Sequence, residues 1–159
     1  MLIIADTSAL ITIATCDGLR WLEYLFENLL IPRAVFLEAT EENKPQSVRL
    51  KRYLSDKVVD INLQDFLITF PIGLGQGELE AMALYKREHA DRLLIDDLRA
   101  RKTASYNGIN IIGSMGVLLL AKKKGLIPAV KPYIELIQRS EIHLGQPLMT
   151  EVLKVADEI

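Results

Sequence analysis

The chain has 159 residues, half of them hydrophobic, and its 19 Lys and Arg against 21 Asp and Glu give a formal charge of −2. This length suits one domain, and the hydrophobic content excludes a chain that is disordered as a whole. The charge excludes a polycationic coat for nucleic acid. The single Cys16 excludes an intramolecular disulfide framework, and with only two histidines the sequence disfavours a zinc centre.

Targeting features are not evident in the sequence. No basic segment precedes the first hydrophobic run, which Asp6 interrupts after a few residues, so the run does not have the pattern of a signal peptide. The longest later hydrophobic run, Met115 to Ala121, is shorter than the roughly 20 residues that span a bilayer. We therefore expect a soluble, cytoplasmic protein.

The small net charge hides an uneven distribution. Between Lys86 and Arg139 there are eleven basic and five acidic residues, whereas the rest of the chain has eight basic and sixteen acidic residues. A solvated helix surface is the ordinary reading of such a stretch. The alternative is a rim that contacts phosphates beside an acidic centre, and the positions of the acids have to decide between the two.

The first half of the chain predicts alternating strands and helices. Leu2 to Ala5 is a short hydrophobic run of the kind found in buried parallel strands, and Pro32 suits the first turn of a helix because its missing N–H is not needed there. Whether 58–61 joins the main sheet is left open. The elements expected in this half are a strand over 2–5, a helix over 9–14, a helix over 19–26 capped by Asp17, a strand over 29–31, a helix from Pro32 and a helix over 46–54.

The second half is more regular. Its expected elements are a helix over 78–89, a strand over 93–95, a helix over 98–106, a strand over 109–112, and helices over 115–124, 130–139 and 148–156. Strands that alternate with helices predict a parallel sheet covered on both faces, because parallel strands need crossover connections. We therefore expect an α/β fold, a three-layer α/β/α sandwich of Rossmann-like type, formed by a single domain over 1–159.

Acidic residues follow two of the predicted strands. Asp6 comes directly after the first strand, and the doublet Asp96–Asp97 follows the strand over 93–95. Ligands of open α/β sheets bind beyond the carboxyl ends of the strands, and burying an acid there costs free energy unless a partner meets it. Asp6 alone could simply cap a helix. Two strands that end in acids favour a shared cation, and oxygen ligands favour Mg²⁺ or Mn²⁺.

Two glutamates could complete this cluster. Glu38 lies one helix after the first strand, and Glu78 opens the helix that precedes the Asp96 strand. Each also has an ordinary interpretation, since Glu38 belongs to an acidic helix end and a glutamate in a first helical turn, such as Glu78, favours the helix dipole. Several acids in one cleft would repel one another strongly, so the cluster hypothesis predicts the binding of one or two cations.

Five segments of the sequence carry a family resemblance. In chain order they are Asp6-Thr-Ser-Ala-Leu10, Pro32-Arg-Ala-Val-Phe-Leu-Glu38, Gly77-Glu-Leu-Glu-Ala81, Arg92-Leu-Leu-Ile-Asp-Asp97-Leu-Arg-Ala-Arg101, and Ile112 through Ile127. Together they resemble the corresponding segments of PIN-domain nucleases, a family that includes the toxins of VapBC-type toxin–antitoxin pairs. The resemblance covers roughly residues 1–127, and 128–159 would be a C-terminal helical extension.

The resemblance implies a PIN-like fold and a metal-dependent nuclease, with Asp6, Glu38, Glu78 and Asp96 as metal-binding acids. Glu78 departs from the toxin group, where Asp is common at this position, and a doublet occupies the fourth position. Because successive strand side chains face opposite ways, we favour Asp96 as the ligand, with Asp97 second. The implied reaction is hydrolysis of phosphodiester bonds in RNA with Mg²⁺ or Mn²⁺ bound.

Further side chains could contact the substrate, and other functions remain open. An antitoxin protein and a second copy of the chain are expected partners. The alternative function is a PIN-like module that binds nucleic acid or protein without cutting it. The candidate substrate-binding residues are Thr7, Ser8, Arg99, Arg101 and Lys122.

Overall fold

The computed structural model describes residues 1–159 and contains one sheet of five parallel strands in the order β3-β2-β1-β4-β5. This confirms the predicted fold class, and the chain order of the strands requires crossovers that carry helices to both faces. Continuous hydrophobic runs form the central strands because parallel strands are buried on both faces. The strands are β1 (Leu2–Ala5), β2 (Asn28–Pro32), β3 (Val58–Val59), β4 (Arg92–Leu94) and β5 (Ile111–Ile112).

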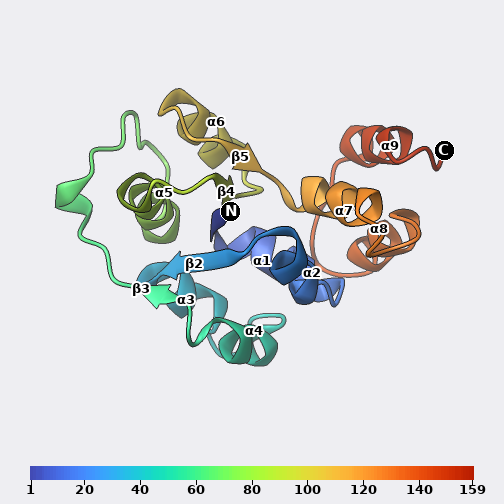
Figure 1. Ribbon diagram of the computed structural model, residues 1–159, viewed down its shortest axis with the longest axis horizontal. Helices are drawn as coiled ribbons and strands as arrows, with labels where there is room; N and C mark the ends of the chain where they lie inside the picture. Colours follow the sequence, from blue (N-terminus) through green and yellow to red (C-terminus); the bar gives the residue numbers. More distant parts are fainter.

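The helices cover the sheet in two layers. In Figure 1, α5 and α6 lie on one side of the strands and α1 to α4 on the other, while α7 to α9 gather at the C-terminal end of the molecule. The helices are α1 (Thr7–Thr15), α2 (Leu19–Leu25), α3 (Arg33–Ala39), α4 (Ser47–Leu54), α5 (Gln76–Glu88), α6 (Leu98–Tyr106), α7 (Ser114–Lys123), α8 (Lys131–Gln138) and α9 (Gln146–Val155), with a short 3₁₀ helix η1 (Leu63–Asp65).

Two local expectations are refined by the structure. The open question about 58–61 is answered by β3, which pairs in parallel with the end of β2 through Val58 and Val59. Asp17 does not cap the second helix. Its backbone is left-handed, Gly18 is the N-cap residue, and the Asp17 carboxylate pairs instead with Arg49 at 3.2 Å.

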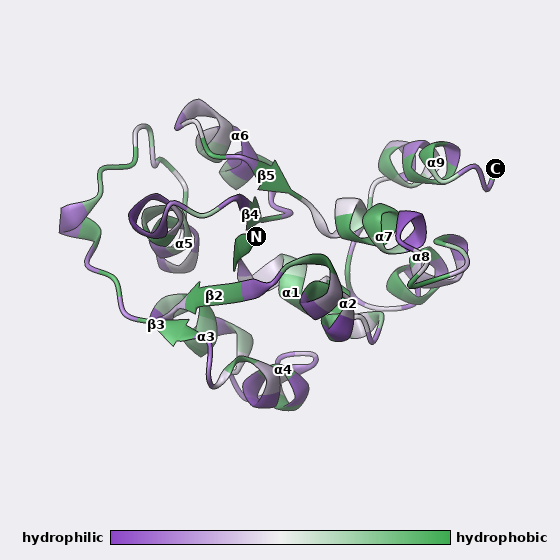
Figure 2. Ribbon diagram, viewed as in Figure 1, coloured by the Kyte–Doolittle hydropathy of each residue, from purple (hydrophilic) through white to green (hydrophobic).

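One hydrophobic cluster runs through the whole molecule, from Ile3 in β1 to Ala156 after α9. Figure 2 shows the strands mostly in the hydrophobic colour, with a hydrophilic start to β2, whereas the helices carry both hydrophobic and hydrophilic residues. The helices after Ile127 contribute Ile134, Ile137 and Met149 to this cluster, so they pack against the same core as the sheet. No helix is long and hydrophobic enough to cross a membrane.

Candidate metal-binding active site

The strand register brings the predicted acids to one edge of the sheet. Ala5 of β1 pairs with Leu94 of β4, and Leu94 pairs with Ile112 of β5. The backbone N–H of Asp6 then donates to the Leu94 carbonyl at 2.9 Å, so Asp6 lies directly beyond the last rung of the ladder. The carboxyl ends of β1, β4 and β5 therefore end at a common level, where an α/β sheet binds its ligands.

Asp6 is buried without a hydrogen-bond partner for one of its carboxylate oxygens. It is 3% exposed, and its Oδ1 is the one buried side-chain oxygen or nitrogen in the protein with no partner. Asp6 occupies the N-cap position of α1, but its side chain makes no capping hydrogen bond. The helix-capping interpretation of this residue therefore fails.

Burial is the largest reason why the pKa of Asp6 rises from 3.8 to about 7. The negative charges of Glu78, Glu38 and Asp97 raise the pKa further, and only the Thr7 N–H opposes them. A buried oxygen with no partner, surrounded by like charges, is costly to keep in a fold. A cation at this point would lower that cost.

Glu38, in the last turn of α3, is held in place by two donors. The Thr7 hydroxyl donates to Glu38 Oε2 at 3.0 Å, and the backbone N–H of Gly77 donates to Glu38 Oε1 at 3.2 Å. A Cβ atom at Gly77 would lie only 2.7 Å from Glu38 Oε2, so glycine is needed for this close approach. In the sequence Gly77 is only the first residue of the segment 77–81, and its contact with Glu38 joins α3 to the start of α5.

Glu78 lies half-buried in the first turn of α5. The Gly75 N–H donates to Glu78 Oε2 at 3.4 Å, which fits the expected first-turn role. Burial, followed by the charges of Asp97 and Glu38, nevertheless raises the pKa of Glu78, while Arg99 and the Gly75 N–H oppose the rise. Glu78 therefore faces the same acids as Asp6.

The two residues of the aspartate doublet have different surroundings. Asp96 accepts two hydrogen bonds from Ser114, one from its N–H at Oδ1 (2.7 Å) and one from its hydroxyl at Oδ2 (2.6 Å). Both carboxylate oxygens of Asp96 are therefore bonded to the start of α7. Asp97 is the N-cap residue of α6 and accepts the Ala100 N–H at Oδ2 (2.9 Å). The negative charge of Asp97 raises the pKa of both Asp6 and Glu78.

The pairing of β4 with β5 extends past Leu94, since the Ile95 N–H donates to the Ile112 carbonyl at 2.9 Å, and the doublet follows directly. Ser114 donates to both oxygens of Asp96, whereas Asp97 accepts a single N–H. Ser114 is the residue that the sequence reasoning missed. A Gly-Ser pair directly after the last strand, at the same edge as the acids, was the available signal.

The expected substrate contacts divide into two groups. Ser8 is exposed, and so is Arg99, which lies close enough to Glu78 to influence it electrostatically. Thr7 is buried and bonded to Glu38, and Arg101 donates to the Ile95 carbonyl at 2.9 Å. The structure therefore leaves Ser8 and Arg99 accessible, whereas Thr7 and Arg101 make bonds within the fold.

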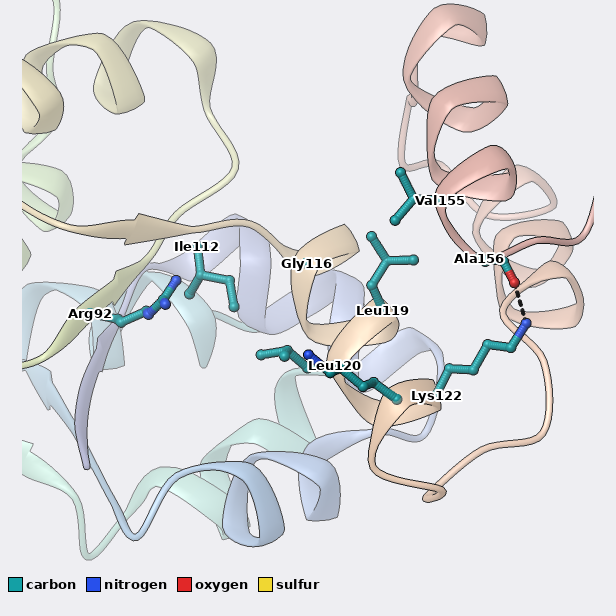
Figure 3. Close-up of a pocket in the computed structure, with 9 residues that line it drawn as sticks. Arg92, Ile112, Gly116, Leu119, Leu120, Lys122, Val155 and Ala156 are labelled. Atoms are coloured by element: carbon teal, nitrogen blue, oxygen red, sulfur yellow. Dashed lines mark hydrogen bonds between the residues drawn. The ribbon is translucent and has the colours of Figure 1, made fainter.

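Lys122 is not brought to the acids. It lies at the end of α7 away from Ser114, where its ammonium donates to the Ala156 carbonyl and to Glu158 Oε2 at 2.9 Å. Figure 3 shows it beside a cavity of about 480 Å³ between β4, β5, α7 and the end of α9. None of the candidate acids lines this cavity, whose walls include Leu119, Leu120 and Val155.

The donor set at the edge fits a hard divalent cation in its chemistry. All candidate ligands are carboxylates, which Mg²⁺ and Mn²⁺ prefer, and one buried oxygen has no other partner. The carboxylates do not form a finished coordination sphere, since no group of three or more His, Cys, Asp or Glu side chains is arranged to hold a metal ion. Binding would thus require side-chain adjustment, for which the exposed Asp97 and the half-buried Glu78 have room.

The family comparison agrees with this arrangement. A family model described as a PIN domain matches residues 2–158, and the chain belongs to the PIN-domain family. The match extends beyond Ile127, so the C-terminal helices are included in it. A search of curated proteins finds no significant match. Family membership supports a nuclease that uses divalent metal at a coarse level.

Proposed function

We propose that this protein is a metal-dependent ribonuclease that hydrolyses phosphodiester bonds in RNA. The observation that carries the proposal is the buried, unpartnered Oδ1 of Asp6, together with the charges of Glu38, Glu78 and Asp97 around it. These four carboxylates are the proposed ligands of Mg²⁺ or Mn²⁺. When bound, the cation would lower the pKa of a water molecule and offset negative charge on the phosphate.

The residues of the chain position this chemistry. Thr7 and Gly77 each donate a hydrogen bond to the Glu38 carboxylate, which fixes its position between α1 and α5. Asp96 binds Ser114 and thereby fixes the start of α7 beside the same edge. Arg99, close to Glu78, is placed to contact a substrate phosphate, because a guanidinium binds phosphate oxygens in pairs.

The test is cleavage of labelled single-stranded RNA by the purified protein with Mn²⁺ or Mg²⁺, with and without EDTA. We expect cleavage only with metal, and we expect Asp6→Asn to reduce the rate by more than roughly 100-fold because it removes a charged ligand. The exposed Asp65→Asn substitution is the matched control and should cleave at the normal rate. Metal-independent cleavage, or full activity in Asp6→Asn, would refute the assignment. If RNA is bound but never cut, a non-catalytic PIN module is the better description.

The further proposal is that this activity serves as the toxin of a toxin–antitoxin pair. Regulated expression in a bacterial host should then arrest growth, and Asp6→Asn should not. Arrest by both forms at equal protein levels would mean that the effect does not come from the acidic edge, and no arrest by the active enzyme would reject the toxin role.

A further inference from the structure

An exposed apolar surface begins at the acidic edge and extends along α6 to its C-terminal end. It is formed by the loop 66–75, between η1 and α5, and by the outer face of α6, which Figure 1 shows next to each other. Large apolar side chains rarely gather on the outside of a protein without a binding role. The exposed apolar residues of these two segments are Leu67, Phe70, Ile72, Leu98 and Tyr106.

The loop is fixed to α6 by defined contacts. The Thr69 N–H donates to Asn107 Oδ1 at 2.8 Å, and Asn107 Nδ2 donates to the Thr69 carbonyl at 3.0 Å. The rings of Phe70 and Tyr106 then meet edge to face, with centroids 5.0 Å apart at 89°. Phe70 is 59% exposed and Tyr106 is 70% exposed, so the pair is held in place while most of its ring surface faces water.

The Phe70 backbone adds a cost to this arrangement. Its φ is +55°, in the left-handed region that a bulky side chain rarely adopts. An ordinary packing role would repay that strain by burying the ring, but the ring is exposed. The position therefore points to a contact that the protein makes with something outside itself.

Arg99 connects this surface with the acids. It lies near enough to Glu78 to act on it electrostatically, and on its other side it packs on Gly73, where a Cβ atom would be 2.4 Å from Arg99 Nη1. Arg99, Lys102 and Tyr106 are spaced at i, i+3 and i+7 on α6 and are all exposed, so they share one face of the helix. Arg99, Lys102 and the Phe70–Tyr106 pair thus lie in this order along α6, starting from the acidic edge.

We propose that Phe70 and Tyr106 form a stacking platform for bases of single-stranded RNA, with Arg99 and Lys102 contacting the phosphates between the platform and the acids. This proposal rests on the ribonuclease function and deepens it by assigning where the strand lies. From Asp97 to Tyr106 the helix rises about 13 Å, which corresponds to roughly four stacked nucleotides. Stacking is tolerant of sequence because every base has a flat face.

RNA fits this surface better than a protein partner does. A strand needs cations for its phosphates and aromatic faces for its bases, and Arg99 and Lys102 followed by the Phe70–Tyr106 pair supply both over a short distance. The path also ends at the carboxylates, which a scissile phosphate must reach. Binding of a protein to the same apolar residues is one of the outcomes of the test.

The experiment measures binding of labelled oligouridines by fluorescence anisotropy in EDTA, so that the strand is not cut. Phe70→Ala and Tyr106→Ala should each weaken the binding of an octamer roughly 5- to 100-fold, whereas Tyr106→Phe should retain it. The control is Tyr24→Ala, which removes an equally exposed ring from α2 and should change nothing. Circular dichroism checks that each variant is folded. A second measurement cross-links 5-iodouridine RNA to the wild-type protein, with adducts expected on the peptides that contain Phe70 and Tyr106.

The outcomes separate the platform from the nuclease function. Weaker binding of the two Ala variants, with adducts on these peptides, supports the platform. Normal binding by the Ala variants, or adducts only elsewhere, overturns it while metal-dependent cleavage still stands, and the surface is then better assigned to a protein partner. If the wild-type protein neither binds nor cleaves RNA, the platform and the proposed function fall together.

Discussion

Asp6 at the edge of the sheet and Glu158 near the C-terminus are both acids with little exposed surface, and their surroundings are opposite. Glu158 accepts the Val130 N–H at 2.8 Å, the Lys131 N–H at 3.0 Å and the Lys122 ammonium at 2.9 Å. Burial acts to raise its pKa, but these donors outweigh it, so the pKa of Glu158 lies below its usual value. Asp6 has an oxygen without any partner, and its pKa rises to about 7.

The difference separates a carboxylate that stabilises the fold from one that burdens it. Glu158 joins the end of the chain to α7 and to the start of α8, and both oxygens of its carboxylate already accept hydrogen bonds within the protein. Asp6 lies among other acids in a place where the fold gains nothing from the charge. Retained strain of this kind is typical of functional sites, because a ligand rather than the protein completes the bonding.

The comparison is tested most strongly by removing the charge of Asp6 in metal-free protein. The unfolded state loses the Asp6 proton near pH 3.8, but the folded state keeps it to about pH 7, so the free energy of unfolding falls as the pH rises between these values. An asparagine does not ionise, so Asp6→Asn should not lose stability over this pH range. It should raise the free energy of unfolding on the order of 3 kcal/mol at about pH 8, and much less at about pH 4.

Urea unfolding in EDTA at the two pH values measures this effect. Asp65→Asn makes the same chemical change at an exposed position and should shift neither value by much. If Asp6→Asn is less stable than the wild type at pH 8, the Asp6 carboxylate is not a burden and the contrast with Glu158 fails.

Metal addition should offset the free-energy cost of the buried Asp6 charge. Mn²⁺ or Mg²⁺ that binds only the folded state at a hundred times its dissociation constant stabilises it by about 2.7 kcal/mol, or roughly 5–10 °C in the unfolding midpoint for a chain of this size. A thermal scan with and without metal checks this. The shift should disappear in Asp6→Asn and persist in Glu158→Ala; an undiminished shift in Asp6→Asn would place the cation elsewhere.

The fold and the position of the acids at one edge of the sheet could be predicted because both depend on local sequence patterns. Uninterrupted hydrophobic runs such as Leu2 to Ala5 predict buried parallel strands, and β1, β2 and β4 form where expected. Since parallel strands end at a common edge, an acid after such a run must lie there, and Asp6 does. Val58 and Val59 were ambiguous because a strand of two residues carries no periodicity of its own.

The details of the site depend on contacts between distant segments. The different surroundings of Asp96 and Asp97 depend on Ser114, which donates to Asp96 from eighteen residues further along the chain. Lys122 looks like any solvated lysine in a basic run, yet its partner Glu158 lies thirty-six residues away. Tertiary packing decides such pairings, and a single sequence shows no trace of them.

Loss of the Glu158 carboxylate should have the opposite sign to loss of the Asp6 charge. Glu158→Ala removes the acceptor of two N–H groups at the start of α8 and leaves the Lys122 ammonium with the Ala156 carbonyl alone, so it should lower the free energy of unfolding by about 2 kcal/mol near neutral pH. Because the pKa of Glu158 is lowered in the folded state, its contribution is complete above the ordinary value of 4.5 and fades as the pH falls below it.

Denaturant unfolding across this pH range measures the Glu158 effect, with Glu151→Ala on the exposed side of α9 as the control. Metal-dependent cleavage should be unchanged in Glu158→Ala under conditions where the protein is folded. A loss of cleavage by the folded variant would show that the two regions are coupled, and that the division between a stabilising and a functional carboxylate is too simple.

The smallest expected effect tests whether the hydrogen bond from Thr7 holds the Glu38 carboxylate in position for catalysis. The Thr7 hydroxyl donates to Glu38, so Thr7→Val should free the Glu38 carboxylate from one of its two donors. We expect kcat to fall about 5-fold, equivalent to about 1 kcal/mol, with little change in KM, because Thr7 acts on the position of Glu38 and not on substrate binding. Thr7→Ser keeps the hydroxyl and should restore the rate.

Thr12→Val is the matched control for Thr7→Val. Thr12 is also a buried threonine of α1, but its hydroxyl donates to the Ser8 carbonyl at 3.0 Å, within the helix and away from the acids. Steady-state cleavage kinetics should show a lower kcat in Thr7→Val alone, although both variants lose one hydroxyl. Equal losses of kcat would mean that the rate follows the packing of α1 in general, whereas a loss confined to Thr7→Val means that the hydrogen bond to Glu38 is part of the functional arrangement.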